Sequence, residues 1–501
     1  MSKHAIWLAV VLWCVAGAGV SWAQSYLDLE NQIQEFTLDN GIRFLVLERH
    51  EVPVFSFVTT VAAGSANETM GYTGVAHLLE HMAFKGTEDI GTLDRGKERK
   101  AMAREDEAFT ALKAERLKGS AADPDRLAEL EQAFEDAKAA ALELVEVNEF
   151  SQIVENNGGR GLNAGTGKDM TMYYYHLPSN RLELWAYLEG QRMCHPVLRE
   201  FYTEKDGPVT EERRMYSDNN PITLLLEQFQ NVAFISHPYH HSIVGYMDDL
   251  KNMDRAYCEE FYRKNYVGSA LTVSVVGDVE FDQVRRLAEK HFSDLPAGEP
   301  PVVERTEPTQ RGEKRVMVEH SSQPICVIGY HTVGIDHPDK SASDALASIL
   351  GQGRTSRLHK ALVNEQKIAV NVGAFSGYPG EKYPNLFLIY AIPAKDVTAA
   401  ELEAAVLEEV DRLRAEGATA AELASVKRRT RAQFIRGLRG NFGMAQQLSY
   451  FQAMTGDWRN TFRQAEKIDA VTLADIRRVA DETLVANNRT VGHIVTAGDE
   501  S

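Results

Sequence analysis

Cysteine is scarce in this sequence, with four in 501 residues. Cys14 lies in an apolar stretch at the N-terminus, and Cys194, Cys258 and Cys326 are widely spaced in the rest of the chain. Three isolated cysteines fit neither a disulfide framework nor a thiolate metal site, which needs closely spaced pairs. We therefore expect all three to be small buried side chains.

Positive charge is also short, because 54 lysines and arginines stand against 72 aspartates and glutamates and the net charge is −18. Binding to nucleic acid needs a basic surface, so this balance argues against such a role. Hydrophobic residues at 44% and charged residues at 25% are ordinary for a globular protein. These values exclude a disordered chain, a fibrous repeat and a polytopic membrane protein.

One long apolar run, residues 5–20, lies at the N-terminus. It follows a short positive start, and Ser21-Trp22-Ala23 then places small residues at −3 and −1 of a cleavage point before Gln24. This pattern is typical of a secretory signal peptide. We expect residues 1–23 to be removed on export, to a bacterial periplasm, with no transmembrane anchor left after processing. An uncleaved membrane anchor is the alternative.

Two distant stretches of the sequence follow the same pattern. Residues 256–267 are typical of an amphipathic helix and lead into an apolar strand at 271–276, and residues 475–485 lead in the same way into a strand at 489–495. Each stretch closes a segment of roughly 200 residues or more, as expected if one α+β domain had been duplicated.

The boundary between the two halves lies near residue 300. Four prolines among residues 295–308 prevent a helix or a central strand there, which indicates a linker. We therefore expect an N-terminal domain at residues 24–295, a linker at 296–312 and a homologous C-terminal domain at 313–501.

Residues 94–148 form an island rich in alanine, leucine and charged residues. Residues 97–118 and 125–148 have the composition of helices, and Gly119 to Pro124 separate them. We expect an inserted helical hairpin. It is either a solvated structural insertion or an arm that binds a partner.

The residues that indicate chemistry are His77-Leu-Leu-Glu-His81. Residues 42–48 and 54–62 are typical of strands, and a helix is expected from near Val75 to beyond Phe84. On a helix, His77 and His81 project from one face, one turn apart, so their neutral nitrogens can bind one Zn²⁺. Glu80 lies beside the metal position, where a carboxylate can take a proton from zinc-bound water.

H-x-x-E-H is the inverted zinc motif of the inverzincins. Residues 74–87 around it resemble the pitrilysin family of zinc peptidases, and within it the group similar to the mitochondrial processing peptidase, which includes exported bacterial members. Residues 158–171, His237-Pro-Tyr-His-His and Gly277-Asp278 also match landmarks of this family. The resemblance covers essentially the whole mature chain. It implies an α+β fold with two homologous α/β-sandwich-like domains.

The resemblance also implies one Zn²⁺ per chain, with a glutamate from a later helix as third ligand. Register against the family pattern makes this ligand Glu212, with Glu211 as the alternative. The family usually has another glutamate seven residues earlier, where this chain has Lys205. The neighbouring Glu204 is a candidate for its supporting role, and Gly207-Pro208 is expected to start the ligand helix late.

Family members bind an extended peptide at a sheet edge, and Asn163 and Ala164 match the strand that receives it. Arg357 matches an arginine that holds substrate together with a downstream tyrosine. Here the tyrosine position falls on Val370, and Tyr378 lies eight residues later. A surface salt bridge is the alternative role for Arg357.

This difference suggests a division of labour between subunits. In two-subunit members of the family one chain holds the zinc and its partner supplies the Arg/Tyr pair. We expect this chain to be the zinc-bearing subunit of such a heterodimer, with a homodimer as the alternative. The expected function is that of a zinc endopeptidase acting on peptides or unfolded segments. A scaffold or assembly subunit with weakened chemistry is the other hypothesis.

Overall fold

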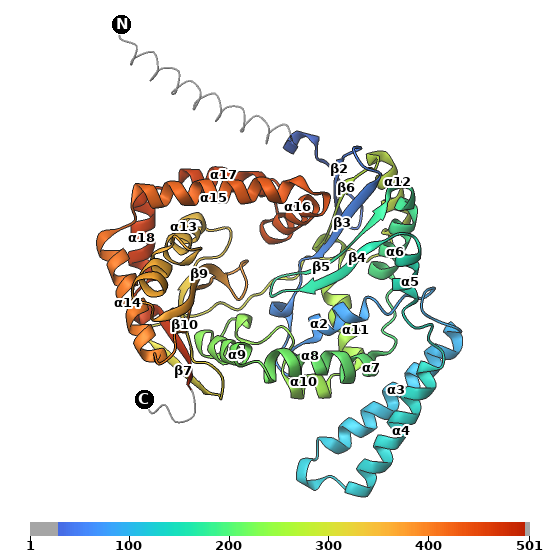
Figure 1. Cartoon of the computed structure of the whole chain (residues 1–501). Coiled ribbons are helices and arrows are strands. Elements are labelled where there is room, and N and C mark those ends of the chain that lie inside the picture. Colours follow the sequence, from blue (N-terminus) through green and yellow to red (C-terminus); the bar gives the residue numbers. More distant parts are fainter. Residues whose placement is uncertain (1–28, 496–501) are drawn as a thin grey trace.

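The computed structural model describes residues 29–495 and contains two β-sheets, one in each half of the chain (Figure 1). The expected signal peptide, residues 1–23, lies outside the described residues. Among the residues that are described, no helix has the length and apolar character that crossing a membrane requires. Cys258 and Cys326 are buried, Cys194 is partly buried, and all three are free thiols.

The first sheet has six strands in the order β1-β2-β6-β3-β5-β4. Strands β2 and β6 are parallel, and the other neighbours are antiparallel. The strands are β1 (Gln34–Thr37), β2 (Arg43–Glu48), β3 (Val54–Val61), β4 (Arg160–Thr166), β5 (Thr171–Pro178) and β6 (Leu271–Gly277). The strands expected at 42–48 and 54–62 are thus present as β2 and β3.

The second sheet has five strands in the order β7-β11-β8-β10-β9. Strands β7 and β11 are parallel, and the other neighbours are antiparallel. The strands are β7 (Lys314–Glu319), β8 (Ile325–Thr332), β9 (Ala369–Tyr378), β10 (Asn385–Pro393) and β11 (Arg489–Val495). This order and these directions repeat β2-β6-β3-β5-β4 strand for strand. The expected α+β fold with two homologous domains is therefore confirmed.

Helices surround both sheets. Those of the first half are α2 (Val75–Met82), α3 (Arg95–Arg116), α4 (Pro124–Leu142), α5 (Glu149–Asn156), α6 (Leu182–Cys194), α7 (Phe201–Glu204), α8 (Thr210–Arg213), α9 (Pro221–Ala233), α10 (Met247–Asn252), α11 (Arg255–Asn265) and α12 (Phe281–His291). Those of the second half are α13 (Lys340–Gly351), α14 (Ala399–Glu416), α15 (Ala420–Arg439), α16 (Asn441–Thr455), α17 (Asn460–Ala470) and α18 (Leu473–Thr483).

The described residues also form short helical turns. The 3₁₀ turns are η1 (Ser65–Asn67), η2 (Gly119–Ala121), η3 (Ser179–Arg181), η6 (Pro238–His240), η7 (Gly268–Ala270) and η9 (Ala486–Asn488). The π-helical turns, which are one residue wider than an α turn, are η4 (Lys205–Val209), η5 (Arg214–Asp218) and η8 (His359–Glu365).

Each half of the chain contributes one helix that packs on the sheet of the other half. Helix α16 of the second half packs on β3 and β6 of the first sheet, and α9 of the first half packs on β7 and β11 of the second. Leu45 and Val58 meet Met444 and Leu448 in one of these contacts. In the other, Phe229 of α9 packs among strand residues such as Val327 and Ile494. This exchange buries apolar surface of both halves and holds the sheets together.

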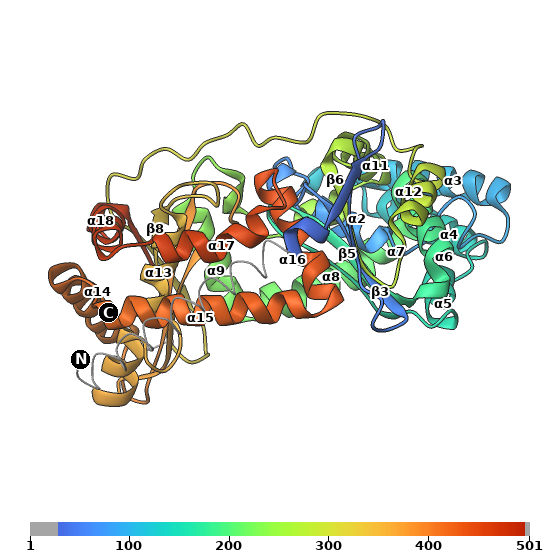
Figure 2. The same cartoon turned by 90° about the horizontal axis from the view of Figure 1, so that it is seen from above.

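The connection between the halves, residues 292–313, contains neither helix nor strand and runs across the molecule as an extended segment (Figure 2). Helices α3 and α4 lie side by side and project away from the sheets (Figure 1). The second of these helices was expected to continue to Asn148, but it ends at Leu142. The chain turns there because buried Val145 pairs with Thr92 in a β-bridge at the base of the projection.

Candidate metal centre

Helix α2 begins at a tightly fixed point. Gly74 has a φ of 90°, which favours glycine, and a side-chain carbon there would lie 2.3 Å from the carbonyl oxygen of Val244. The carboxylate of Glu68 accepts hydrogen bonds from the backbone N–H groups of Gly74 and Ala76, both at 2.9 Å. Burial raises the pKa of the Glu68 carboxyl to about 8. These contacts set the axis and rotation of the helix.

The helix ends at Met82, whereas it was expected to continue beyond Phe84. The N–H of Lys85 donates to the carbonyl oxygen of Met82 at 3.0 Å, and the chain then turns through Gly86, whose φ of 109° favours glycine. The two histidines lie within the helix, so this earlier end does not affect them.

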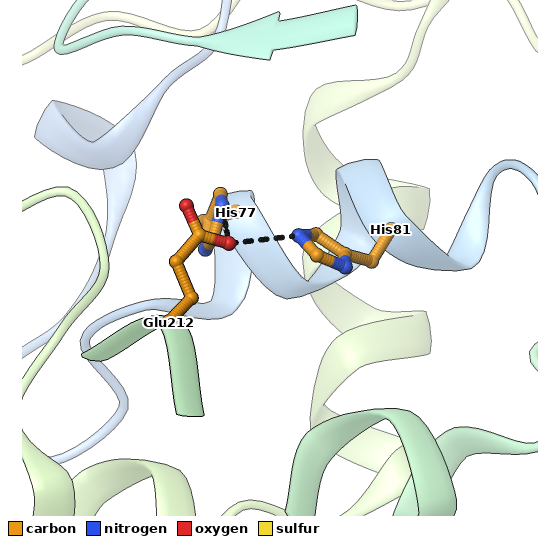
Figure 3. A group of neighbouring side chains, drawn as sticks. All are labelled: His77, His81 and Glu212. Carbon is orange, nitrogen blue, oxygen red and sulfur yellow. Dashed lines mark ion pairs between the residues drawn. The ribbon is translucent and has the colours of Figure 1, made fainter. Parts of the chain in front are cut away.

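His77, His81 and Glu212 converge on one point (Figure 3). The two imidazole rings have centroids 4.7 Å apart. Oε2 of Glu212 lies 3.6 Å from Nε2 of His77 and 3.5 Å from Nε2 of His81. All three ligand atoms lie within 4.8 Å of one another. Within the described part of the chain, this is the one group of His, Cys, Asp and Glu side chains arranged to hold a metal ion.

The donor set fits zinc. Zn²⁺ binds imidazole nitrogen and carboxylate oxygen at about 2.0–2.2 Å, so tetrahedral ligands lie roughly 3.3 Å from one another. The two distances from Glu212 come close to this value. Two imidazoles and one carboxylate leave a fourth position for water, the arrangement of a catalytic rather than a structural zinc site.

Of the two candidates for the third ligand, the structure brings Glu212 to the histidines. The side chain of Glu211 is 56% exposed and forms an ion pair with Arg214, one turn along the same helix. Glu212 is 33% exposed and faces α2. Glu211 points away from the two imidazoles, so Glu212 is the residue that would complete the site.

The helix that carries Glu212 starts earlier than expected. Helical structure is continuous from Phe201 to Asp218, so Gly207-Pro208 lies inside it rather than at its start. Proline lacks an N–H and clashes with the carbonyl four residues earlier in an α-helix. The wider π turn η4 accommodates Pro208, and a second π turn, η5, follows Arg213. Such turns often occur at functional sites.

Glu204 supports His81 from behind. Its Oε1 lies 2.9 Å from Nδ1 of His81, and its Oε2 pairs with Nζ of Lys85 at 2.6 Å. Burial opposes a charge on His81, but the carboxylates of Glu204 and Glu212 outweigh it and raise the pKa of the imidazole to about 9. A carboxylate on the second nitrogen of a ligand histidine fixes the orientation of its ring.

Lys205 takes no part in this contact. Its Nζ donates to the carbonyl oxygen of Lys251 at 3.2 Å and lies 4.8 Å from the ring centroid of Phe109 in the projecting helices. The lysine therefore faces the α3–α4 pair, while Glu204 provides the carboxylate near His81.

His77 differs from His81 in its protonation. Burial, and after it the neighbouring His81, lower the pKa of the His77 imidazole to about 4, because a buried charge loses its hydration and is repelled by a like charge. His77 is therefore neutral at pH 7. In the tautomer protonated at Nδ1, its Nε2, which faces Glu212 at 3.6 Å, offers the lone pair that a metal ligand needs.

Glu80 lies beside this group and is held by the first sheet. Its Oε2 accepts a hydrogen bond from the hydroxyl of Thr166, the last residue of β4, at 2.7 Å. Burial raises the pKa of the Glu80 carboxyl, and the bond from Thr166 partly opposes that shift. The sequence reasoning missed Thr166. It lies two residues after Ala164, on the same side of one strand, and this spacing could have revealed it.

Asn163 and Ala164 lie on β4, the edge strand of the first sheet, next to the site. The side-chain oxygen of Asn163 accepts a hydrogen bond from the N–H of Ala164 at 2.8 Å. The outer edge of β4 pairs with no other strand among residues 29–495. It can therefore accept an extended peptide by strand addition.

The residues of the second half considered for substrate binding lie away from the metal-binding group. Arg357 binds the carboxylate of Glu422 at 2.7 and 2.9 Å and the carbonyl oxygen of Gly417 at 2.8 Å, and these contacts hold the α14–α15 connection. Val370 is exposed on β9, the edge strand of the second sheet. The hydroxyl of Tyr378, at the other end of β9, accepts a hydrogen bond from Gln230 at 2.5 Å. The structure brings none of these three into contact with the metal-binding group.

Known protein families and relatives that match this sequence are zinc peptidases or their domains, in agreement with a metal-binding group at His77, His81 and Glu212. The family model "Insulinase (Peptidase family M16)" matches residues 44–126, and "Peptidase M16 inactive domain" matches residues 252–430. The chain is 28% identical to zinc protease PqqE of Helicobacter pylori over 96% of each protein.

Solved structures show the same fold. A protease from Helicobacter pylori has a TM-score of 0.77 and 26% identity over 92% of this chain and 99% of that one. The periplasmic protease PqqL from Escherichia coli has a TM-score of 0.68 and 16% identity, over 93% of this chain and 47% of that one. The two matched family models and the inverted zinc motif on α2 show that this chain belongs to the M16, or pitrilysin-type, peptidase family.

Proposed function

We propose that this protein is a zinc-dependent endopeptidase that hydrolyses peptides or unfolded segments. The observation that carries the proposal is the placement of Glu80. Its carboxylate lies on the helix of His77 and His81 and is hydrogen-bonded to the edge strand that can accept a peptide. The proposed base, metal ligands and substrate strand would therefore meet in one place.

His77, His81 and Glu212 would hold one Zn²⁺. The ion would supply Lewis-acid chemistry, activating a water molecule and polarising the scissile carbonyl. Glu80 would accept the proton of that water and pass it to the nitrogen of the leaving amine. The raised pKa of Glu80 suits both tasks, because a group that must gain and then lose a proton works best near the ambient pH.

The edge of β4 would orient the substrate. An added peptide strand would bond to the backbone near Asn163 and Ala164, which gives affinity with little dependence on sequence. A folded protein cannot present such a strand, so flexible peptides are the expected substrates. An exported, periplasmic location fits the signal-like N-terminus and the description of PqqL as a periplasmic protease.

We further propose that the chain is the zinc-bearing subunit of a two-subunit peptidase. The exposed Val370 and the engagement of Arg357 with Glu422 leave the Arg/Tyr pair incomplete in this chain. A homologous subunit would supply it in a heterodimer. In a homodimer, Arg357 of each copy would take this role instead. That Arg357 holds substrate stays a prediction.

A scaffold subunit with weakened chemistry is the second candidate. It is favoured by the match of residues 252–430 to a domain described as inactive. That match leaves out residues 77–81, where both histidines and the base are present. A purely structural subunit needs neither the metal-binding histidines nor the base.

The deciding experiment is digestion of a mixed library of unstructured peptides by the purified mature chain, with Glu80→Gln beside it. Cleavage that disappears in Glu80→Gln while bound zinc remains would support the endopeptidase. Glu88→Gln, which changes an exposed carboxylate paired with Arg95, is the matched control and should cleave normally. Zinc without cleavage would favour the scaffold or a missing partner subunit, and a folded chain that binds no zinc would contradict the proposal.

A further inference from the structure

Two equivalent hairpin turns of the duplicated fold meet at Asp169. Strands β4 and β5 are joined through residues 167–170, and their counterparts β9 and β10 through residues 379–384. Oδ2 of Asp169 accepts hydrogen bonds from the backbone N–H groups of Glu381 at 2.9 Å and Lys382 at 3.2 Å. Oδ1 accepts one from the hydroxyl of Tyr239 at 2.6 Å. One buried carboxylate thus joins the first domain to the second.

The contact is closely fitted from both sides. A side-chain carbon at Gly380 would lie 2.6 Å from the Tyr239 hydroxyl and 2.7 Å from Oδ2 of Asp169, so only glycine allows this approach. Behind the turn, the N–H of Ile335 donates to the carbonyl oxygen of Glu381 at 2.8 Å, and the Tyr450 hydroxyl of α16 donates to the Glu381 carboxylate. The second-domain turn is therefore held rigidly where it receives Asp169.

The same first-domain turn touches the proposed active site. Thr166, at its start, donates to the base Glu80 at 2.7 Å. The carbonyl oxygen of Lys168 accepts from the N–H of Ala66 at 2.8 Å, and the buried ammonium of Lys168 donates to the carbonyl oxygen of His241. The carboxylate that binds the second domain lies three positions after the hydroxyl that binds the base.

We propose that Asp169 is a positioning residue for peptide hydrolysis. By docking on the second domain it fixes the end of β4, and so sets Thr166 against Glu80 and the strand edge against the substrate. It does not itself touch substrate or metal. The expected effect on cleavage rests on the proposed function. The coupling of the two turns does not, and it can be measured without activity.

The test is Asp169→Ala in the zinc-loaded chain, measured by backbone hydrogen exchange and by peptide cleavage. We expect faster exchange at the amides of Glu381 and Lys382, which lose their acceptor, and also in β4. Zinc content should not change. Cleavage should fall about tenfold, the effect expected from losing roughly one charge-assisted hydrogen bond.

Glu403→Gln is the matched control. Glu403 is also buried, but it binds Arg315 and His493 within the second domain. This variant should lose thermal stability without changing exchange in β4 or the cleavage rate. If both variants change β4 exchange and cleavage equally, Asp169 has a general structural role and the proposal is wrong.

Tyr239→Phe provides a second variant if Asp169→Ala does not fold. It removes one of the three donors and should give smaller changes in the same direction. Faster exchange at residues 381 and 382 with unchanged β4 exchange would overturn the coupling. If the wild-type chain alone cleaves no peptide, which would point to a scaffold or a missing partner subunit, exchange in β4 still decides whether the coupling exists.

Discussion

Helices α2 and α13 occupy the same place in the two copies of the duplicated domain. Each follows the central strand of its sheet, β3 or β8, and packs on the edge strand, β4 or β9. Helix α2 carries two histidines and a glutamate, whereas the buried residues of α13 are three alanines, two serines, two leucines, one isoleucine and one glycine. A side-chain carbon at Gly351, the end of α13, would lie 2.1 Å from the backbone nitrogen of Ala374 on β9.

This difference shows that one framework supports two kinds of helix packing. In the second domain small residues bring helix and edge strand into direct contact, which leaves no room there for imidazole rings. In the first domain the helix carries polar side chains that meet Glu212 from another helix. Both helices still hydrogen-bond to the edge strand, Glu80 with Thr166 at 2.7 Å and Ser343 with Ser376 at 3.0 Å. A side-chain hydrogen bond from helix to edge strand is therefore common to both domains, and in the described residues the metal-binding group lies on the first.

The largest expected effect separates the two adjacent glutamates of the ligand helix. Glu212→Gln should abolish zinc binding and cleavage, because the two imidazoles then lack the carboxylate that completes the site. The loss should exceed the roughly 10- to 100-fold effect of changing an outer partner. Metal analysis after dialysis, with peptide cleavage, measures both. Glu211→Gln, which changes an exposed side chain paired with Arg214, is the control and should bind zinc normally.

A smaller effect is expected at Glu204, whose carboxylate orients the ring of His81. Glu204→Gln should weaken zinc affinity by roughly 10- to 100-fold, because the amide interacts less strongly with the Nδ1–H group than a carboxylate does. Competition with a chelator gives the affinity. Glu200 also lies near Lys85, at 3.8 Å, but forms no contact with His81, so Glu200→Gln should leave the affinity unchanged. Equal losses in both variants would assign the effect to Lys85 instead.

The bond between Thr166 and Glu80 predicts a change in pH dependence. This bond lowers the pKa of Glu80, so Thr166→Val should raise it further. The proposed role of Glu80 as a base requires its ionised form, so activity should fall as the pH drops through its pKa. The acidic limb of kcat/KM should move to higher pH by about one unit or less, roughly the value of one hydrogen bond.

The equivalent contact in the second domain supplies the control for that shift. Ser343→Ala removes the hydrogen bond from α13 to Ser376 and should leave the pH profile unchanged, because no base lies there. A shift in both variants would show that the contact acts through packing between the domains. It would then contradict a direct effect of Thr166 on the base.

The sequence predicted the duplicated fold and the residues of α2 well, because helical spacing and strand patterning are local properties. Glu212 was placed by its register in a family pattern, and its distance from the histidines depends on how two helices pack. The early start of the ligand helix was missed because proline usually breaks an α-helix, whereas here a π turn accommodates Pro208. Asp169 acts through a contact between segments far apart in the chain, which no local pattern encodes, whereas the spacing of Thr166 from Ala164 on one strand could have revealed Thr166.

The smallest effect on chemistry is expected at Arg357. Its guanidinium already binds Glu422 and the carbonyl oxygen of Gly417, so Arg357→Ala should lower the free energy of unfolding by about 1.5–3 kcal/mol. In the isolated chain kcat/KM should change little. Glu422→Gln breaks the same pair from the other side and should give a similar loss of stability. A different result would be a more than tenfold loss of cleavage in Arg357→Ala but not in Glu422→Gln. Arg357 would then bind substrate instead of Glu422, and the second domain would contribute to catalysis although α13 carries no metal-binding histidines.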